Sequence, residues 1–254
     1  VNNASGNIAT ITADLAATPN DIVATGGGRI DHIAGTAGTG GGSWMFVGQD
    51  STLSTYNLAD TSVAGGGITG YGQGSGTLNA TGNLQVAAWG GNRVGTMNIN
   101  TTGALNVTGA LRIGNDGGSV GIMNLESGTV VVSNNGAVFA GTENNIGHGG
   151  GIATLNISGG SLSVSNGLRL GNESGGNGTL TLSGTGALNV ADELIVGRES
   201  GTGVLNVNGG TITTSGNGNM YIGRRNGTGT LNQSNGVISV IYEFGVGTRD
   251  DNKI

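Results

Sequence analysis

One short motif returns along almost the whole chain, and this repetition limits the fold more than any other feature. The motif is a Leu or Met that usually follows Thr. Successive copies are separated by 25, 19, 26, 32, 25, 25 and 26 residues. A period of this length is typical of solenoids, in which each repeat packs only on its neighbours. The copies stand at Leu53, Leu78, Met97, Met123, Leu155, Leu180, Leu205 and Leu231.

Two further signals follow the motif in a fixed order. One is an alternating run such as Leu188-Asn189-Val190, and the other is an apolar pair that ends in Gly, such as Leu194-Ile195-Val196-Gly197. Their period of two is that of a strand, and the Gly, Asn and Ser between them suit turns. We therefore predict an all-β fold, a parallel β-helix (β-solenoid) with three short strands in each coil of about 25 residues. A right-handed coil is favoured.

A β-sandwich or a β-propeller also contains many short strands at regular spacing. Propeller blades repeat at about 40 residues or more, which is longer than the period seen here. Sandwiches do not repeat the same tripeptides, and strands this short cannot fill a wide sheet. The period therefore favours the β-helix over both alternatives.

Composition excludes several classes of protein. Although 56 of the 254 residues are Gly, 35% are hydrophobic, so the chain can bury a core and is not disordered. The formal charge of -6 and a single lysine, Lys253, argue against nucleic-acid binding. No apolar run approaches the roughly 20 residues of a membrane span. Because the chain has no Cys, disulfides and thiolate metal sites are excluded.

The two ends of the chain differ from its middle. Residues 1–45 have weaker periodicity and contain the only proline, Pro19, so we expect an N-terminal cap, degenerate coils or a docking segment. Residues 46–254 are expected to form a β-solenoid of about eight coils that stops in mid-coil. Since an open coil exposes strand edges, we expect the protein to partner with itself end to end in a filament. An extra loop is expected at 143–151, with His148 in it.

The sequence contains no evident catalytic group. His32 and His148 lie far apart, and no Ser has an evident His partner. We therefore expect a protein that is not an enzyme, with no catalytic residue and no cofactor. Calcium is the one metal ion that the sequence suggests, because carboxylates occur two residues after the Gly that closes the third strand. These candidates are Asp116, Glu143, Glu173 and Glu199, followed by Arg225 and Arg249.

The spacing of this acidic column is irregular and departs from the calcium-binding nonapeptide of β-helices. Solvated charges with an ion pair between Glu199 and Arg225 are the favoured interpretation, and calcium is the weaker one.

A column of amides is expected on the outer face of the first strands. The structural interpretation is an amide ladder, in which stacked side chains hydrogen-bond from coil to coil. The alternative is a lattice that faces ice or a glycan, although Ile122, Thr181 and Val204 interrupt the pattern. The column consists of Asn79, Asn98, Asn124, Asn156, Asn206 and Asn232.

The third strands present a different outer column, with Arg112 and Arg169 among its members. Phe139, Ile195 and Tyr221 in this column predict a packing stripe, for a loop of the same chain or for another molecule. Trp44 and Trp89 are candidates for sugar platforms, with local plugs as the more ordinary interpretation.

From about Ser51 to Gly247 the pattern, as in GNGTLTLSGTGALNVADELIVGRESGTGVLNVNGGTI, resembles the repeats of autotransporter passengers and PEP-CTERM-sorted exoproteins of Gram-negative bacteria. The GTL, GAL and IG signals carry the resemblance. It implies secretion, a right-handed β-helix and adhesive or matrix roles, without shared catalytic residues.

We therefore expect a non-enzymatic, extracellular structural or adhesive protein of the cell surface, with itself and surface glycans as partners. One alternative is a β-helix that binds or cleaves a carbohydrate, for which a groove lined by Arg112 and Arg169 would argue. A third is an ice-binding protein.

Overall fold

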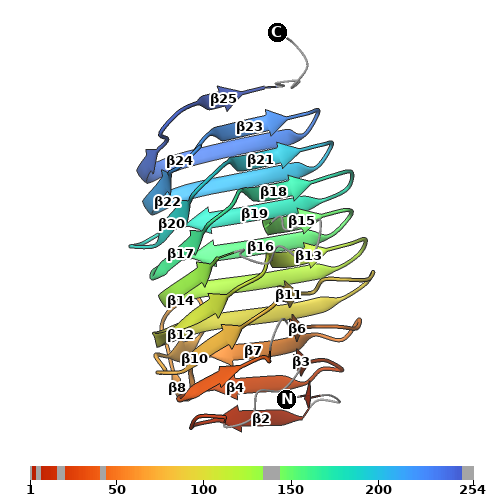
Figure 1. Cartoon of the computed structure of the whole chain (residues 1–254), viewed down its shortest axis with the longest axis vertical. Coiled ribbons are helices and arrows are strands. Elements are labelled where there is room, and N and C mark those ends of the chain that lie inside the picture. The colour runs from red at the N-terminus through yellow and green to blue at the C-terminus, as the bar shows by residue number, and fades with distance from the viewer. Residues whose placement is uncertain (1, 4–6, 16–20, 41–43, 134–143, 248–254) are drawn as a thin grey trace.

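Parallel strands stacked coil upon coil form a β-solenoid, as Figure 1 shows. This structure is a computed structural model, and it describes residues 2–3, 7–15, 21–40, 44–133 and 144–247. The described residues contain strands and no helix, so none of them forms a helix that could cross a membrane. The predicted parallel β-helix is therefore confirmed.

The third strand of each coil contributes to one sheet of ten parallel strands. Its members are β1 (Asn2–Asn3), β3 (Ile22–Ala24), β6 (Met45–Val47), β11 (Leu84–Val86), β13 (Leu111–Asn115), β15 (Asn144–His148), β18 (Leu168–Asn172), β21 (Leu194–Arg198), β23 (Met220–Arg224) and β25 (Phe244–Val246). We call the outer side of this sheet the third face.

First and second strands share a sheet of thirteen, because in several coils they run on as one long strand. Its members are β2 (Ile8–Ile11), β4 (Arg29–His32), β5 (Thr36–Gly38), β7 (Ser54–Leu58), β10 (Thr77–Ala80), β12 (Val94–Val107), β14 (Val120–Val132), β16 (Ile152–Ile157), β17 (Ser161–Val164), β19 (Asn177–Leu182), β20 (Ala187–Val190), β22 (Thr202–Thr214) and β24 (Thr228–Ser239). The outer sides of the first and second strands are the first face and the second face.

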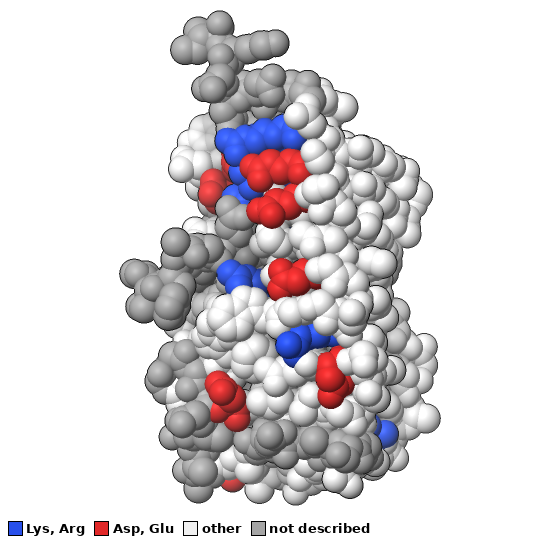
Figure 2. Space-filling view, turned by 90° about the vertical axis from the view of Figure 1, so that its right-hand side faces the viewer, with Lys and Arg blue, Asp and Glu red and all other residues white. Residues whose placement is uncertain are grey.

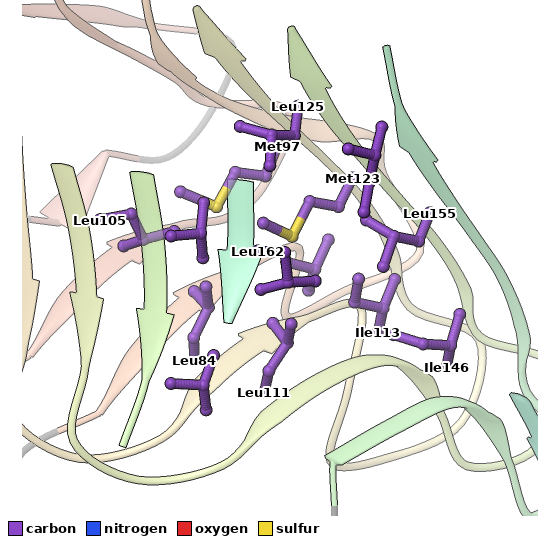
Figure 3. Close-up of a cluster of buried hydrophobic side chains, with 14 of the residues drawn as sticks. Leu84, Met97, Leu105, Leu111, Ile113, Met123, Leu125, Ile146, Leu155 and Leu162 are labelled. Atoms are coloured by element: carbon purple, nitrogen blue, oxygen red, sulfur yellow. The ribbon is translucent and has the colours of Figure 1, made fainter. Parts of the chain in front are cut away.

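The core is a column of aliphatic side chains that repeat in register from coil to coil. Leu155 pairs with Leu180, and Leu180 pairs with Leu205, and all three are fully buried. Figure 3 shows how inward side chains from the three strands of successive coils meet in the middle. Burying each such side chain stabilises the fold by roughly 1.5–3 kcal/mol.

Close approach between coils requires Gly at particular positions. A Cβ on Gly203 would lie 2.3 Å from both the Leu170 carbonyl oxygen and the Gly197 nitrogen. Only Gly fits this corner, which explains why Gly recurs where the third strand of one coil packs against the next first strand.

The first of the repeat positions needs a correction. Leu53 is 53% exposed, and Tyr56 is the residue that pairs with Met97 in the core column. Leu78 lies in a second strand, where it pairs with Leu105. The physical reason is an insertion: the antiparallel hairpin of β8 (Asp60–Ala64) and β9 (Tyr71–Gly72) separates the first strand of this coil from its second.

The coil that contains His148 also differs from the prediction. Residues 144–148 form strand β15, which pairs with β13 and β18, so they are not a loop. Ile146 occupies the core position between Ile113 and Leu170. The residues that lengthen this coil therefore precede Asn144, and Phe139 and Glu143 lie outside the described residues.

Strands near the N-terminus belong to the same two sheets as the later coils. Strand β2 pairs with β4, and β4 with β7, while β3 joins β6 in the other sheet. Ile22 and Ile30 are fully buried in the common core.

Candidate functional site

A ladder of hydrogen-bonded amides runs along the first face. The Nδ2 of Asn124 donates to Oδ1 of Asn98 at 2.8 Å, and the Nδ2 of Asn156 donates to Oδ1 of Asn124 at 2.9 Å. Nearer the C-terminus, Asn232 donates to Asn206 at 2.9 Å, and Asn206 donates to the Thr181 hydroxyl at 3.5 Å. These bonds hold each amide at the height of its own coil.

Toward the N-terminus, the ladder continues to residues that the sequence pattern did not reveal. Asn98 donates to Oδ1 of Asn57 at 2.8 Å, and Asn57 donates to Oδ1 of Asp31 at 2.7 Å. Arg29 holds the same carboxylate through two bonds of 2.6 and 2.7 Å. Burial alone would raise the pKa of Asp31, but the bonds from Arg29 and Asn57 hold it below its ordinary value. The sequence did not reveal Asp31 and Asn57 as ladder members, because the β8–β9 insertion disturbs the spacing of the repeats in this region.

The β8–β9 hairpin covers this lower part of the first face. Its Thr69 hydroxyl donates to Glu126 Oε2 at 2.7 Å, and Asn100 Nδ2 donates to the Tyr71 carbonyl at 2.9 Å. Asn57 is fully buried, and Asn98 is 7% exposed. The part of the ladder that solvent reaches therefore begins at Asn124.

Asn79 does not belong to this ladder. It pairs with Asn106 on the second face, and the Nδ2 of Asn106 donates to its Oδ1 at 2.8 Å. The sequence pattern assigned Asn79 to the wrong column for the same reason as Leu78, because both lie in strand β10, which follows the β8–β9 insertion.

Beside the ladder, the first face carries a second outward column, two residues earlier in each strand. Its upper members are half-buried or exposed. Neighbouring coils lie about 4.8 Å apart and alternate residues of a strand about 7 Å apart, so the two columns form a nearly flat grid. This second column consists of Thr96, Ile122, Thr154, Thr179, Val204 and Thr230.

The acidic column lies at the turns that follow the third strands. Asp116, Glu173 and Glu199 each have a positive φ, as does Arg225 one coil further. In the coil of β15, the pairing of His148 with Asn115 and Asn172 places Gly149 at this position, and Glu143 lies outside the described residues. Arg249 lies outside the described residues. A neutral Gly therefore interrupts the carboxylates that were weighed as calcium ligands.

Ion pairs connect the upper turns of this edge. Glu199 contacts Arg225 at 2.9 Å and Arg198 at 2.7 Å, and Arg224 contacts Glu193 at 2.6 Å. Figure 2 shows acidic and basic side chains interspersed along this side of the rod. The described residues contain no group of three His, Cys, Asp or Glu side chains that could hold a metal ion.

The two histidines have separate structural contacts. His32 is fully buried, with Nδ1 2.9 Å from the Tyr56 hydroxyl and Nε2 3.0 Å from the Gly35 carbonyl. His148 Nε2 lies 3.1 Å from Glu173 Oε1 at the charged edge.

The third face is largely covered. Ile195 is 1% and Tyr221 is 3% exposed, so both are packed within this chain. The Arg224 guanidinium lies 4.7 Å from the Tyr221 ring centroid, and the Tyr221 hydroxyl donates to Glu243 at 3.2 Å.

Two arginines predicted on the third face flank a residue that was not expected there. Asn145, in place of Phe139, lies between Arg112 and Arg169. Burial, together with the nearby Arg198, lowers the pKa of Arg169 to about 10.

Nearer the N-terminus on the third face, Trp89 meets two aromatic side chains that are distant from it in sequence, Trp44 and Phe46. The ring centroids of Trp44 and Trp89 are 4.4 Å apart, and those of Trp44 and Phe46 are 5.8 Å apart. Sequence reasoning treated the tryptophans as isolated, because the pairing of β6 with β11 that brings them together was not recognised.

Comparison with known proteins adds no relative to this description. No family model, curated protein or solved structure matches the chain.

Proposed function

We propose that this chain is a non-enzymatic structural and adhesive module of an extracellular surface protein of a Gram-negative bacterium. One observation carries the proposal: the amide ladder and the adjoining column place small polar groups along one flat face in most coils, with Ile122 and Val204 as the apolar members. Such a surface offers many weak, equivalent contacts, which together give strong attachment to a repetitive partner.

The rod supports this role mechanically. Its core is continuous, and strand pairing along the axis links each coil to the next. Ten stacked third strands at about 4.8 Å give a rod of roughly 43 Å, along which the first face is displayed.

Adhesion of coated beads tests the proposal. Beads carrying the protein are flowed over immobilised mucin and over cellulose, and the retained fraction is counted. A variant with Thr154→Glu, Thr179→Glu and Thr230→Glu adds charge to the first face. Its matched control carries Ser163→Glu, Thr213→Glu and Ser239→Glu on the second face.

We expect wild-type and control beads to be retained on the surface and beads that carry the first-face variant to be washed off. Equal retention of both variants would contradict an adhesive first face. Release of reducing sugar from either surface would instead establish an enzyme.

We also propose that copies join end to end. In the described part of the chain, β24 pairs only with β22, and β25 is the last strand of its sheet. Apolar side chains are exposed there, with Val246 at 76% and Tyr242 at 71%. At the opposite end, β2 is the last strand of the thirteen-stranded sheet, and Ile8 is 60% exposed. Strand addition between these ends would propagate as a filament.

Sedimentation velocity and negative-stain microscopy at rising protein concentration test this association. We expect filaments for the wild type and monomers for Phe244→Asp, whereas Val63→Asp, on the exposed part of the β8–β9 hairpin, should still assemble. A wild-type protein that stays monomeric at high concentration would contradict the proposal.

A further inference from the structure

We propose that Trp44, Phe46, Trp89 and Gln85 form a binding site for a neutral saccharide unit on the third face. The inference rests on the adhesive role proposed above and names the chemical class of one partner. Four observations lead to it: the meeting of the aromatic rings, the strained turn of Trp89, the unsatisfied amide of Gln85 and the charges nearby.

The aromatic rings approach each other from opposite ends of neighbouring third strands. Trp44 directly precedes β6, and Trp89 follows β11 in the next coil, yet their ring centroids are 4.4 Å apart. Phe46 projects from the middle of β6 and lies 5.8 Å from Trp44. The cluster therefore spans two coils, and its outermost ring, Trp89, is 56% exposed.

The turn that presents Trp89 is strained. The pairing of Val86 with Ile113 places Ala87 at the position of Gly114, and Trp89 at the position of Asp116. Ala87 has a φ of 51° and Trp89 a φ of 67°, a region that bulky residues rarely occupy. Asp116, Glu173 and Glu199 have a positive φ at the same position of later coils, so the conformation belongs to this turn of the solenoid. At Trp89 this turn carries a bulky indole that is 56% exposed.

An unsatisfied amide lies beside the rings. Gln85 projects outward between Phe46 and Arg112 in the strand register and is fully buried. Within the described residues, neither its Oε1 nor its Nε2 has a hydrogen-bond partner. A buried amide without partners is costly, and a ligand that supplies both a donor and an acceptor would remove that cost.

A sugar ring matches both kinds of group. Its C–H face packs on indoles, while each hydroxyl can donate to Oε1 of Gln85 and accept from Nε2. Charges of both signs lie near the site, so neither sign of ligand is favoured: the Asp116 carboxylate accepts a 3.0 Å bond from the Gly90 nitrogen next to Trp89, and Arg112 is the register partner of Gln85. Because Gln85 is fully buried, binding requires a local movement that exposes its amide, and the proposal places this movement in the turn of Trp89, Gly90 and Gly91.

Tryptophan emission reports directly on this site, because Trp44 and Trp89 are the only two tryptophans of the chain. The protein is titrated with neutral hexasaccharides of glucose, N-acetylglucosamine, mannose and galactose. We expect a saturable change in emission with at least one of them. Gln85→Leu should weaken that binding about tenfold, and Trp89→Ala at least as much. Tyr242→Ala, which removes an exposed aromatic ring elsewhere, should leave it unchanged.

Thermal melting of each variant shows that it is folded. No response to any of the four sugars would overturn the inference, and so would unchanged affinity in both Gln85→Leu and Trp89→Ala. If emission does not respond while coated beads still adhere, only this inference fails, and the adhesive role stands.

Discussion

Buried His32 shows how a single polar residue is accommodated in an apolar core. The Gly35 carbonyl can only accept, so Nε2 of His32 carries the proton, and Nδ1 accepts from the Tyr56 hydroxyl. Both ring nitrogens are thus satisfied in the neutral form. Burial lowers the pKa of His32 below 6.5, and the bond to Gly35 offsets only part of that effect.

A pH dependence of stability follows from His32. Because the native state disfavours the protonated ring, the unfolded chain binds more protons as the pH falls below 6.5, and stability is lost at up to about 1.4 kcal/mol per pH unit. We expect the melting temperature to fall from pH 7.5 to pH 5.5. His32→Gln should flatten this fall, and His148→Gln should keep it. An equal fall in His32→Gln would show that another group is responsible.

Leu180 tests the core column at the same scale. It lies between Leu155 and Leu205 with no exposed surface. Leu180→Asp places an unpaired charge between apolar coils and should cost about 3–5 kcal/mol and broaden the transition. Thr179→Asp, one residue away on the half-exposed outer side, should cost much less. Urea unfolding compares the two, and a Leu180→Asp variant as stable as the wild type would contradict the stacking.

At the scale of the strands, the amide ladder links the coils through side chains as well as through backbone. Asn124 both donates to Asn98 and accepts from Asn156. The described residues show no hydrogen bond between the side chains of Asn156 and Thr181, where the ladder is interrupted.

Two substitutions with opposite expected effects test the ladder. Asn124→Ala removes two bonds and should destabilise the fold by about 1–2 kcal/mol, whereas Thr181→Asn should restore the missing step and stabilise it by about 1 kcal/mol. Denaturant unfolding measures both. A Thr181→Asn variant no more stable than the wild type would show that the ladder contributes little beyond the sheet.

Glycine has a different role at the corners of the coils. Gly203 has backbone atoms within 2.3 Å of where a Cβ would lie, whereas Gly66 has nothing within 4 Å. We therefore expect Gly203→Ala to lower the melting temperature strongly, because the neighbouring coil has to move, and Gly66→Ala to change it little. Equal melting of the two variants would mean that the coils are less tightly packed than described.

The sequence could predict the strands wherever the period was intact. From Met97 toward the C-terminus the core positions of the first strands were assigned correctly, and the outward position of Asn124 or Asn206 followed from alternation. The third strand of the β15 coil was misplaced, because its core position is Ile146. The predictions failed at insertions. The β8–β9 hairpin displaced Leu53, Leu78 and Asn79 from their assumed columns, and no local pattern distinguishes an insertion from a weak repeat.

For a similar reason, the sequence pattern could not predict contacts between segments that are distant in the chain. Asp31 and Asn57 join the ladder only because their first strands stack with the first strand that carries Asn98. The hairpin that covers them is inserted between the first and second strands of one coil. Trp44 and Trp89 meet because β6 pairs with β11. Such pairings depend on the number of residues in each coil, which varies along the chain.

For the molecule as a whole, the central claim is that neighbouring coils stack in one fixed register, so that outward residues form straight columns. Thr179 and Val204 are register partners on the first face, and Asn206 lies two residues further along the same strand as Val204. Partners about 4.8 Å apart can form a disulfide, whereas Cα atoms about 8 Å apart cannot. Since the chain contains no cysteine, each introduced pair can be tested alone.

Oxidation of two double-cysteine variants, followed by mass spectrometry, measures the register directly. The account predicts that Thr179→Cys with Val204→Cys forms an intramolecular disulfide in nearly every molecule, while Thr179→Cys with Asn206→Cys stays reduced. Efficient cross-linking of the second pair, or failure of the first in a folded protein, would contradict it.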